Sequence, residues 1–261
     1  MMKPYKENWQ SATELLIGRE KLDRLKASSV LIVGLGGVGA YAAEMICRAG
    51  TGSITIVDGD TIHPRNRNRQ LIALTSTEGS PKAVLMGNRL REINPELDLT
   101  VIQEYIRDER MCEILDRGFD YVVDAIDTLS PKVYLIYNSL KRGLPVVSSM
   151  GAGGRSDPLR IMINDISETK GCNLARMLRK RLHRLGINSG FTAVYSPEPV
   201  DKSRVMPVSG ERNKASVVGT ISYMPPAFGI CCASVVIRDL AGIPRQYSGT
   251  QPAAPEFLRK R

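Results

Sequence analysis

The sequence predicts an α/β fold in which a Rossmann-like, doubly wound and mostly parallel sheet is extended by a smaller C-terminal α/β portion. Two observations predict it. Short apolar, β-branched runs alternate with helical segments along most of the chain. A glycine-rich turn, Gly34-Leu35-Gly36-Gly37-Val38-Gly39, joins the first of these runs to a helical segment. We expect right-handed crossovers between the parallel strands.

The first unit reads as a strand over residues 30–33, the glycine turn, a helix over 40–49 and a second strand over 53–57 that Asp58 closes. Glycines permit a tight turn and a close approach of the backbone, and the following helix offers unpaired N–H groups to a phosphate. An acid near the end of the second strand is typical of ribose binding. This order of elements predicts a nucleotide site.

The loop after Asp58 is unusually polar. It holds two acids, three arginines and three amides, namely Asp58, Asp60, Arg65, Asn66, Arg67, Asn68, Arg69 and Gln70. An adenine ribose needs one carboxylate, whereas a triphosphate also needs cations and a metal ligand. The loop therefore favours a polyphosphate over a nicotinamide cofactor.

The other elements of the first half follow in order. Short amphipathic helices are expected over 14–25, separated at Gly18. The further expected elements are helices over 82–93, 108–118 and 131–142 and strands over 99–102, 121–123 and 144–149. Lys82 stands at a helix start, where a cation opposes the helix dipole, so contact with a ligand explains it better than a solvated face. Asp124 and Asp127 follow a buried strand at its carboxyl end, where doubly wound sheets bind ligands, and Asp124 is expected to bond loop amides.

The second half begins with a glycine-rich turn over 150–155, read either as a flexible connection or as a ligand contact. Strands are expected over 159–163 and 191–195, and a buried helix over 227–240. Asn173 is expected to cap a basic helix that runs to Gly186. Its buried stripe comprises Leu174, Met177, Leu178, Leu182 and Leu185. Its outer cations are either a solvated face or a phosphate-binding face, while His183 reads as a surface residue.

Two loops complete the chain. A polar loop over 198–214 carries Arg204, Arg212 and Lys214, which could close over a substrate, and residues 249–261 read as a loosely held tail. We expect an N-terminal helical arm (1–28), an ATP-binding portion (29–155), a substrate and dimer portion of the same domain (156–242) and a flexible tail (243–261).

Composition limits the class of protein. The chain has 261 residues, 43% of them hydrophobic, which suffices for one large domain. The net charge of +9 fits either simple solubility or an anionic partner such as nucleic acid. Five cysteines without a C-x-x-C pair exclude a zinc site of that type and fit a reducing cytosol. Residues 215–237 lack charge, but Pro225-Pro226 indicates a turn and a buried helix rather than a membrane span.

Asp58, Asp60, Asn66, Arg69 and Gln70 form a D-x-D, spacer, N-x-x-R-Q pattern that resembles the ThiF/MoeB/HesA-type, ubiquitin-activating-like adenylating enzymes. Over roughly 13–242 the chain resembles the tRNA threonylcarbamoyladenosine dehydratases in particular. The residues that carry this resemblance are Thr13 to Gly18, the glycine turn, Asn66 to Gln70, Ala73, Val123 to Asp127, Pro131-Lys132, Gly151 to Gly154 and Asp157-Pro158.

The resemblance implies ATP-dependent cyclisation of threonylcarbamoyladenosine beside a tRNA anticodon, through an acyl-adenylate. It implies that ATP is bound by Gly34, Gly36, Gly37, Gly39, Asp58, Asp60, Asn66, Arg69, Gln70, Lys82 and Asp127. Arg69, Lys82 and Asp127 would be catalytic, with Lys82 on phosphate and Mg²⁺ on Asp127. The resemblance leaves open whether a monovalent cation also binds.

The resemblance further implies a cytoplasmic homodimer that acts on tRNA, with sulfur-relay proteins as optional partners and no membrane association. Two departures bear on activity. Ala12 stands where family members commonly carry a phosphate-neutralising arginine, for which Arg19 is a candidate substitute or merely part of a solvated face. No cysteine lies at 219–222, which argues against a covalent thioester. Adenylation of a sulfur-carrier protein or peptide C-terminus, and a non-catalytic nucleotide-binding paralogue, remain alternatives.

Overall fold

A computed structural model describes residues 7–207 and 216–244 of the chain. Its main sheet has seven strands in the order β3-β2-β1-β4-β5-β7-β6. These are β1 (Ser29–Val33), β2 (Ser53–Val57), β3 (Asp98–Ile102), β4 (Tyr121–Asp124), β5 (Val146–Ser149), β6 (Met162–Asp165) and β7 (Thr192–Tyr195). All neighbours pair in parallel except β6, which runs antiparallel to β7 at the edge. The predicted doubly wound, mostly parallel sheet is confirmed.

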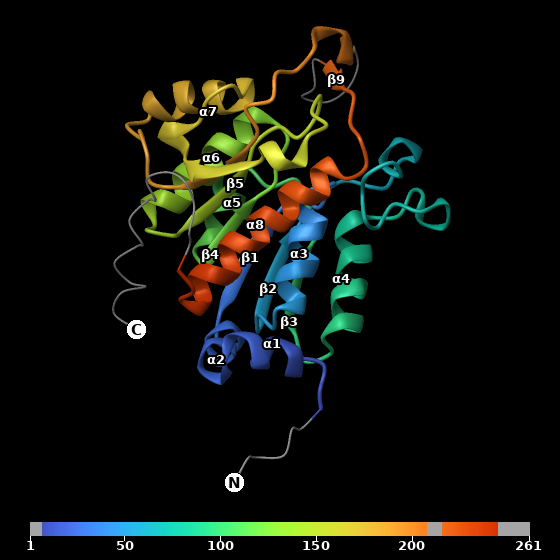
Figure 1. Ribbon diagram of the computed structural model, residues 1–261, viewed down its shortest axis with the longest axis vertical. Coiled ribbons are helices and arrows are strands. Elements are labelled where there is room, and N and C mark those ends of the chain that lie inside the picture. The colour runs from blue at the N-terminus through green and yellow to red at the C-terminus, as the bar shows by residue number, and fades with distance from the viewer. Residues whose placement is uncertain (1–6, 208–215, 245–261) are drawn as a thin grey trace.

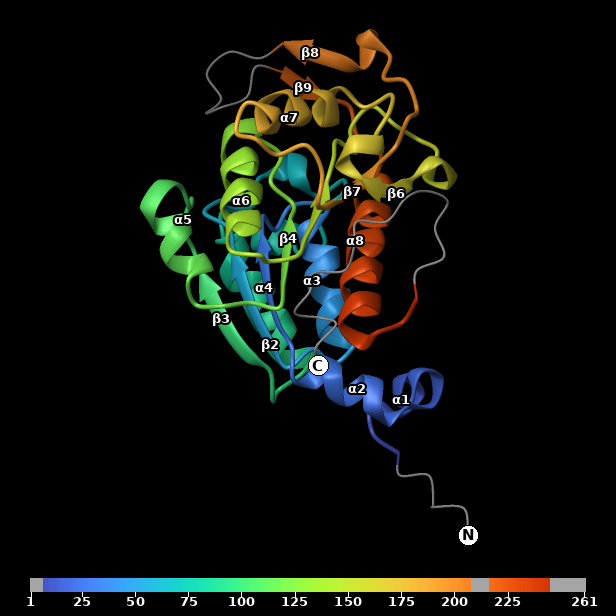
Figure 2. The ribbon, with the colours of Figure 1, turned by 90° about the vertical axis from the view of Figure 1, so that its left-hand side faces the viewer.

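Helices cover both faces of this sheet (Figures 1 and 2). They are α1 (Ser11–Ile17), α2 (Arg19–Lys26), α3 (Gly39–Arg48), α4 (Lys82–Ile93), α5 (Asp108–Leu115), α6 (Leu129–Lys141), α7 (Asn173–His183) and α8 (Met224–Ala241). One hydrophobic core lies between the sheet and α3, α4 and α8, and a second lies between the sheet and α5, α6 and α7. In β1, Val30 and Ile32 enter the first core while Leu31 and Val33 enter the second, as the alternation of a strand requires.

The two ends of the sheet carry different parts of the chain. The glycine turn follows the carboxyl end of β1, whereas α1 and α2 lie beyond the amino ends of the strands, at the bottom of Figure 2. A small antiparallel hairpin, β8 (Val205–Pro207) with β9 (Ser216–Val218), lies above α7 at the opposite end. The predicted break between the first two helices is confirmed at Gly18, whose φ of 85° ends α1.

Several expected boundaries were wrong. The strand expected over 159–163 begins only at Met162, because Pro158 opens a 3-10 turn that the Asp157 carboxylate caps by accepting from Leu159 N–H. Cys172, not Asn173, is the N-cap of α7. Met177 and Leu185 are exposed rather than buried, since α7 turns only the face with Ala175, Leu178 and Leu182 toward the core.

Helix α8 is long and apolar enough to cross a membrane, and it is the one such helix in the part of the chain described. It packs along α3, where Gly229 leaves room for the Val38 backbone, and Phe228, Cys232 and Val235 are fully buried in the core. The expectation of a buried helix at this position is confirmed. Arg212, Lys214 and residues 245–261 of the expected tail lie outside the residues described, whereas Ile243 packs against the core.

A buried ion pair fixes the start of the loop after β4. Lys132 and Asp124 are both completely buried, and Lys132 Nζ lies 2.6 Å from Asp124 Oδ2. Ser148 Oγ donates to the same oxygen at 2.6 Å, and Asp124 Oδ1 accepts from Ile126 N–H at 3.1 Å. The expectation that Asp124 bonds a loop amide is confirmed. Burying two charges is costly, but removing one of them leaves the other uncompensated.

This arrangement predicts a specific stability pattern. Lys132→Met should lower the free energy of unfolding by about 3–5 kcal/mol, because the Asp124 carboxylate stays buried without its cation. The double variant D124N/K132M should lose clearly less, since no charge is then buried. Urea unfolding of the three proteins measures this. Equal losses in the single and double variants would contradict a charge-based penalty at this position.

Candidate active site

The glycine turn brings β1 and α3 so close together that side chains are excluded. Gly34 has a φ of 91°, and a Cβ there would lie 2.8 Å from the Ala125 carbonyl oxygen. A Cβ on Gly39 would overlap the Gly34 carbonyl, and one on Gly37 would lie 2.8 Å from Pro225 Cβ. Gly36 differs, because a Cβ there would meet only Gln70 Nε2, at 3.7 Å. The protein itself does not demand glycine at 36, so close approach of a ligand is the better explanation.

Asp58 ties the end of β2 to this turn. Its Oδ2 accepts from Leu35 N–H at 2.6 Å, and its Oδ1 accepts from Asp60 N–H at 2.8 Å. Burial raises the pKa of Asp58, and the charge of Lys82 and the two N–H donors offset this only in part. The carboxylate predicted to hold ribose is therefore already fixed in position beside the glycine backbone.

Lys82 and Asp60 form an ion pair at the same edge of the sheet. Lys82 is the first residue of α4 and is buried, with Nζ 2.6 Å from Asp60 Oδ2. The Lys82 N–H donates to the Asp60 carbonyl at 3.0 Å, so backbone and side chain are both anchored. Tyr105 Oη donates to Asp60 Oδ1 at 3.3 Å. Tyr105 was not predicted as a site residue, and only the small Gly59 against which it packs hinted at a neighbour there.

The polar loop after Asp58 contains both buried and partly exposed residues. Asn66 is buried and holds the loop, since its Oδ1 accepts from His63 N–H at 2.9 Å. Gln70 is also buried, and its Oε1 has no hydrogen-bond partner. A buried acceptor without a donor is costly, so it marks a place where a ligand hydroxyl or amine fits. Arg69 is half-buried and donates to the Arg65 carbonyl at 3.1 Å and to Asn68 Oδ1 at 2.8 Å.

Asp127 is a further charged residue at the carboxyl end of the sheet. It is exposed just after β4, and its charge acts on Arg69, whose pKa burial lowers and Asp127 partly restores. Within residues 7–207 and 216–244, no three His, Cys, Asp or Glu side chains gather into a metal site. In nucleotide sites, however, Mg²⁺ needs only one or two carboxylates from the protein, because phosphate oxygens and waters supply its other ligands. The donor set therefore fits ATP with Mg²⁺.

Other candidate residues lie elsewhere. Ala12 is on α1, at the amino end of the sheet, and so is remote from the glycine turn of its own chain. Arg19 forms salt bridges with Asp23 and Glu14 on an exposed helix face. Of the two expectations for Arg19, this agrees with a solvated face. Arg204 Nη1 donates to the Gly154 carbonyl at 3.2 Å, which links the hairpin of β8 and β9 to the second glycine turn.

Known proteins resemble this chain in sequence and in fold. The sequence profile described as the ThiF family matches residues 10–258. The tRNA threonylcarbamoyladenosine dehydratase of Bacillus subtilis is 44% identical over 237 residues, covering 88% of this chain and 93% of that protein. The Escherichia coli enzyme of the same name is 33% identical over 245 residues, covering 87% and 91%. The crystal structure of E. coli tRNA N6-threonylcarbamoyladenosine dehydratase, TcdA, with ATP superposes with a TM-score of 0.82 at 30% identity, over 92% of this chain and 98% of that one.

The Asp60–Lys82 pair predicts a pH dependence of stability. Burial acts to raise the pKa of Asp60, but the hydrogen bond and charge of Lys82 outweigh it, so the pKa is lowered in the folded protein. A lowered carboxyl pKa contributes stability above the ordinary pKa of about 3.9, and this contribution is lost as the pH falls through the folded value.

Urea unfolding of the wild type and of Asp60→Asn at a series of pH values measures the contribution. We expect a constant difference in midpoint from about pH 7 to pH 5 and a shrinking difference below about pH 4. A difference that does not change down to the lowest pH at which both proteins fold would contradict the assigned pairing.

Proposed function

The chain belongs to the ThiF family, and on this premise we propose that it catalyses the ATP-dependent dehydration of threonylcarbamoyladenosine in tRNA. The proposal is supported by relatives of that activity that match nearly end to end, in B. subtilis and E. coli. The observation that carries it is the buried Lys82, held at 2.6 Å from Asp60 beside the glycine turn. A buried ammonium next to a phosphate-binding turn is suited to stabilising charge on a nucleotide phosphate.

Each side chain has a proposed role in holding ATP. The turn amides at Gly34, Gly36, Gly37 and Gly39 bind phosphate, and Asp58 binds the ribose hydroxyls. Gln70 accepts a hydrogen bond from the nucleoside through its unpaired Oε1. Asp60 holds the Lys82 ammonium in place, and Asn66 holds the loop from which Arg69 extends.

The reaction has two steps. The carboxylate of the threonylcarbamoyl group attacks the α-phosphorus of ATP, and pyrophosphate leaves, which gives an acyl-adenylate. An internal nucleophile of the same side chain then attacks the acyl carbon, and AMP leaves with one oxygen of the original carboxylate. The net change in the nucleoside is loss of one water. Arg69 and Lys82 stabilise negative charge that develops at the α-phosphate.

Mg²⁺ is the metal we propose for this site, with Asp127 as its protein ligand. When bound, it would stabilise the negative charge of the departing pyrophosphate. The chain contributes the exposed Asp127 carboxylate and the nearby Arg69, whose charges act on each other. No enzyme nucleophile is required, in agreement with the absence of cysteine from 219–222.

The alternative functions are less well supported. C-x-x-C zinc motifs, which would favour activation of a sulfur carrier, are absent from this sequence. A non-catalytic nucleotide-binding paralogue would hold ATP with the same residues, so the similarity to named dehydratases is what favours an enzyme. Sulfur-relay proteins remain optional partners.

We also propose a cytoplasmic homodimer. The five cysteines are unpaired, which fits a reducing compartment. Leu15 and Leu16 on α1 are 80% and 84% exposed, which is unusual for adjacent leucines and suits a surface that a second copy covers. Since Ala12 is remote from its own glycine turn, an arm residue at this position would reach only a partner subunit's nucleotide. The division of the chain into arm, ATP-binding portion, substrate portion and tail belongs to the same proposal.

The central test is a mass measurement. The protein is incubated with ATP, Mg²⁺ and tRNA that carries threonylcarbamoyladenosine. The tRNA is then digested, and the masses of its nucleosides are measured by mass spectrometry. We expect the modified adenosine to lose one water and AMP to form in equal amount. ATP turnover only with a small carrier protein, or none with any acceptor, would refute the proposed activity.

Lys82→Met tests the residue that carries the proposal. AMP formation should fall by about 100- to 1000-fold, as when one transition-state donor is removed. The fold should persist, because Asp60 is partly exposed and stays solvated without its partner. Lys141→Met, an exposed lysine at the far end of α6, is the matched control and should keep full activity. Unchanged AMP formation in K82M would remove Lys82 from the mechanism.

The homodimer has its own test. Replacing Leu15 and Leu16 together by serine should shift the mass in light scattering from dimer to monomer, since the covering apolar contact is lost. Leu159→Ser removes a still more exposed leucine, 94% accessible, from another surface and should leave the mass unchanged. A wild-type protein that is already monomeric, or a double variant that remains dimeric, would exclude this interface.

A further inference from the structure

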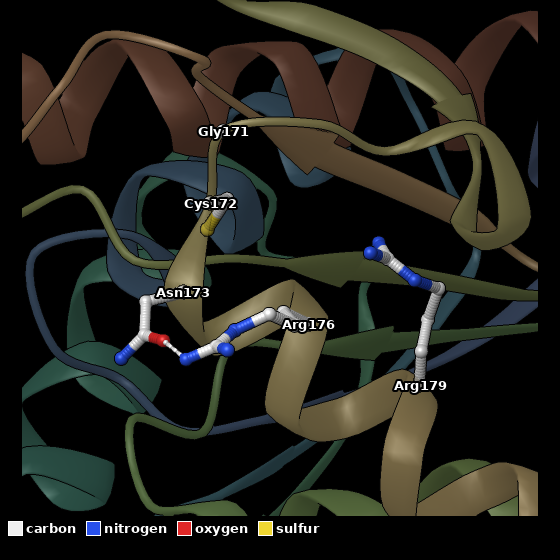
Figure 3. Close-up of a pocket in the computed structure, with 5 residues that line it drawn as sticks. All are labelled: Gly171, Cys172, Asn173, Arg176 and Arg179. Atoms are coloured by element: carbon white, nitrogen blue, oxygen red, sulfur yellow. Dashed lines mark hydrogen bonds between the residues drawn. The ribbon is translucent and has the colours of Figure 1, made fainter.

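A pocket lies at the start of α7, apart from the glycine turn. It has a volume of about 310 Å³ and is lined by Gly171, Cys172, Asn173, Arg176 and Arg179. In Figure 3, Arg176 reaches back across the first helical turn to Asn173, while Arg179 extends from the next turn. Neither the glycine turn nor the charged loop after β2 contributes to the lining, so the proposed ATP chemistry does not explain this pocket.

The two arginines of the pocket are held by neutral groups. Arg176 Nη2 donates to Asn173 Oδ1 at 2.7 Å, and Arg179 Nη1 donates to the Thr169 carbonyl at 2.9 Å and also to its hydroxyl. These partners orient the guanidinium groups but are neutral. In the part of the chain that the structure describes, neither arginine has a carboxylate partner. Guanidinium groups held in place without a counter-charge are suited to binding an oxyanion.

The backbone adds to this charge. Helix α7 has eleven residues, and its N-cap, Cys172, makes no side-chain hydrogen bond to the first turn. Asn173 could have capped a helix, but it is the first helical residue and its side-chain oxygen is used by Arg176. The first-turn N–H groups and the positive end of the helix dipole therefore face the same pocket as the two arginines.

The surroundings of the pocket favour a polymer over a free anion. Helix α7 contains no acidic residue, and its exposed side continues with Lys180, Arg181 and Arg184. A lone phosphate would need only the pocket, whereas a row of cations fits a chain of regularly spaced phosphates.

The same helix contacts the first turn of α6, shortly after Asp127 in the chain. Arg181 Nη1 donates to Ser130 Oγ at 3.1 Å, and Ser130 lies in the first turn of α6, three residues after Asp127. Helices α6 and α7 lie side by side in both views, at the end of the molecule that carries the glycine turn (Figures 1 and 2). A polyanion on α7 would therefore extend toward the residues that hold ATP.

We propose that the α7 pocket binds a backbone phosphate of the tRNA substrate, and that the cationic side of α7 is part of the tRNA docking surface. The identity of the polyanion rests on the proposed function. An enzyme that acts on a base beside the anticodon must hold the anticodon stem and loop in a fixed register. Proteins usually achieve this through contacts with backbone phosphates. Arg176 and Arg179, with the first-turn N–H groups, supply that contact.

Binding of a labelled, unmodified tRNA transcript tests the proposal independently of turnover. Arg176→Gln should weaken tRNA binding by about 5- to 10-fold, the loss typical of a charge-assisted hydrogen bond near the surface. The slope of log K against log salt should decrease in magnitude by about 0.7–0.9, because one phosphate contact is lost. R176K, which keeps the charge, should retain most of that slope and also checks that the helix tolerates substitution.

Arg91→Gln is the matched control, since Arg91 is an exposed arginine on α4, on another side of the molecule. It should leave tRNA affinity unchanged, and R176Q should leave ATP affinity unchanged. Equal tRNA binding by the wild type and R176Q would overturn the proposal. So would binding of inorganic phosphate that R176Q abolishes without any effect on tRNA, because the pocket would then be a free-anion site. Failure of the wild type to dehydrate tRNA would refute the activity instead, and the two outcomes are thus separate.

Discussion

The close approach of β1 and α3 at the glycine turn is the constraint on which the rest of the site depends. Gly34 and Gly39 approach each other through the backbone, and Gly37 leaves room for the side chain of Pro225 at the start of α8, so β1, α3 and α8 converge at the turn. This contact exposes the first-turn N–H groups of α3 at the carboxyl edge of the sheet. Asp58 then ties the next strand to the turn through Leu35 N–H, so the charged loop that follows Asp58 starts at a fixed position beside the turn.

Around this neutral turn the protein arranges paired rather than isolated charges. Lys82 is held by Asp60, and Asp127 acts on Arg69. Behind them the fully buried Asp124 and Lys132 fix the start of the loop that carries Asp127. A nucleotide entering the site would thus meet cations already positioned by their partners. Such preorganisation reduces the reorganisation needed when charge develops on a phosphate.

The sequence predicted the sheet, the nucleotide turn and the charged loop because these depend on local patterns: alternating apolar runs, glycine spacing and short motifs. It did not predict contacts between distant segments. Tyr105 reaches Asp60 across 45 residues, and apart from the small Gly59 no pattern near either residue signals the pairing. Lys132 was noted only as part of the family resemblance, since its burial depends on Asp124 and on Ser148 of β5. The buried stripe of α7 was too wide, because helical periodicity gives the apolar face but not how much of it the neighbouring elements cover.

The central claim is that the substrate carboxylate attacks the α-phosphorus of ATP. Isotope transfer tests it most directly. With ¹⁸O in the carboxylate of the threonylcarbamoyl group, a single turnover should deliver one labelled oxygen to the phosphate of AMP. Labelled oxygen in the pyrophosphate or in inorganic phosphate, or AMP that carries no label while the nucleoside loses water, would contradict the adenylate mechanism.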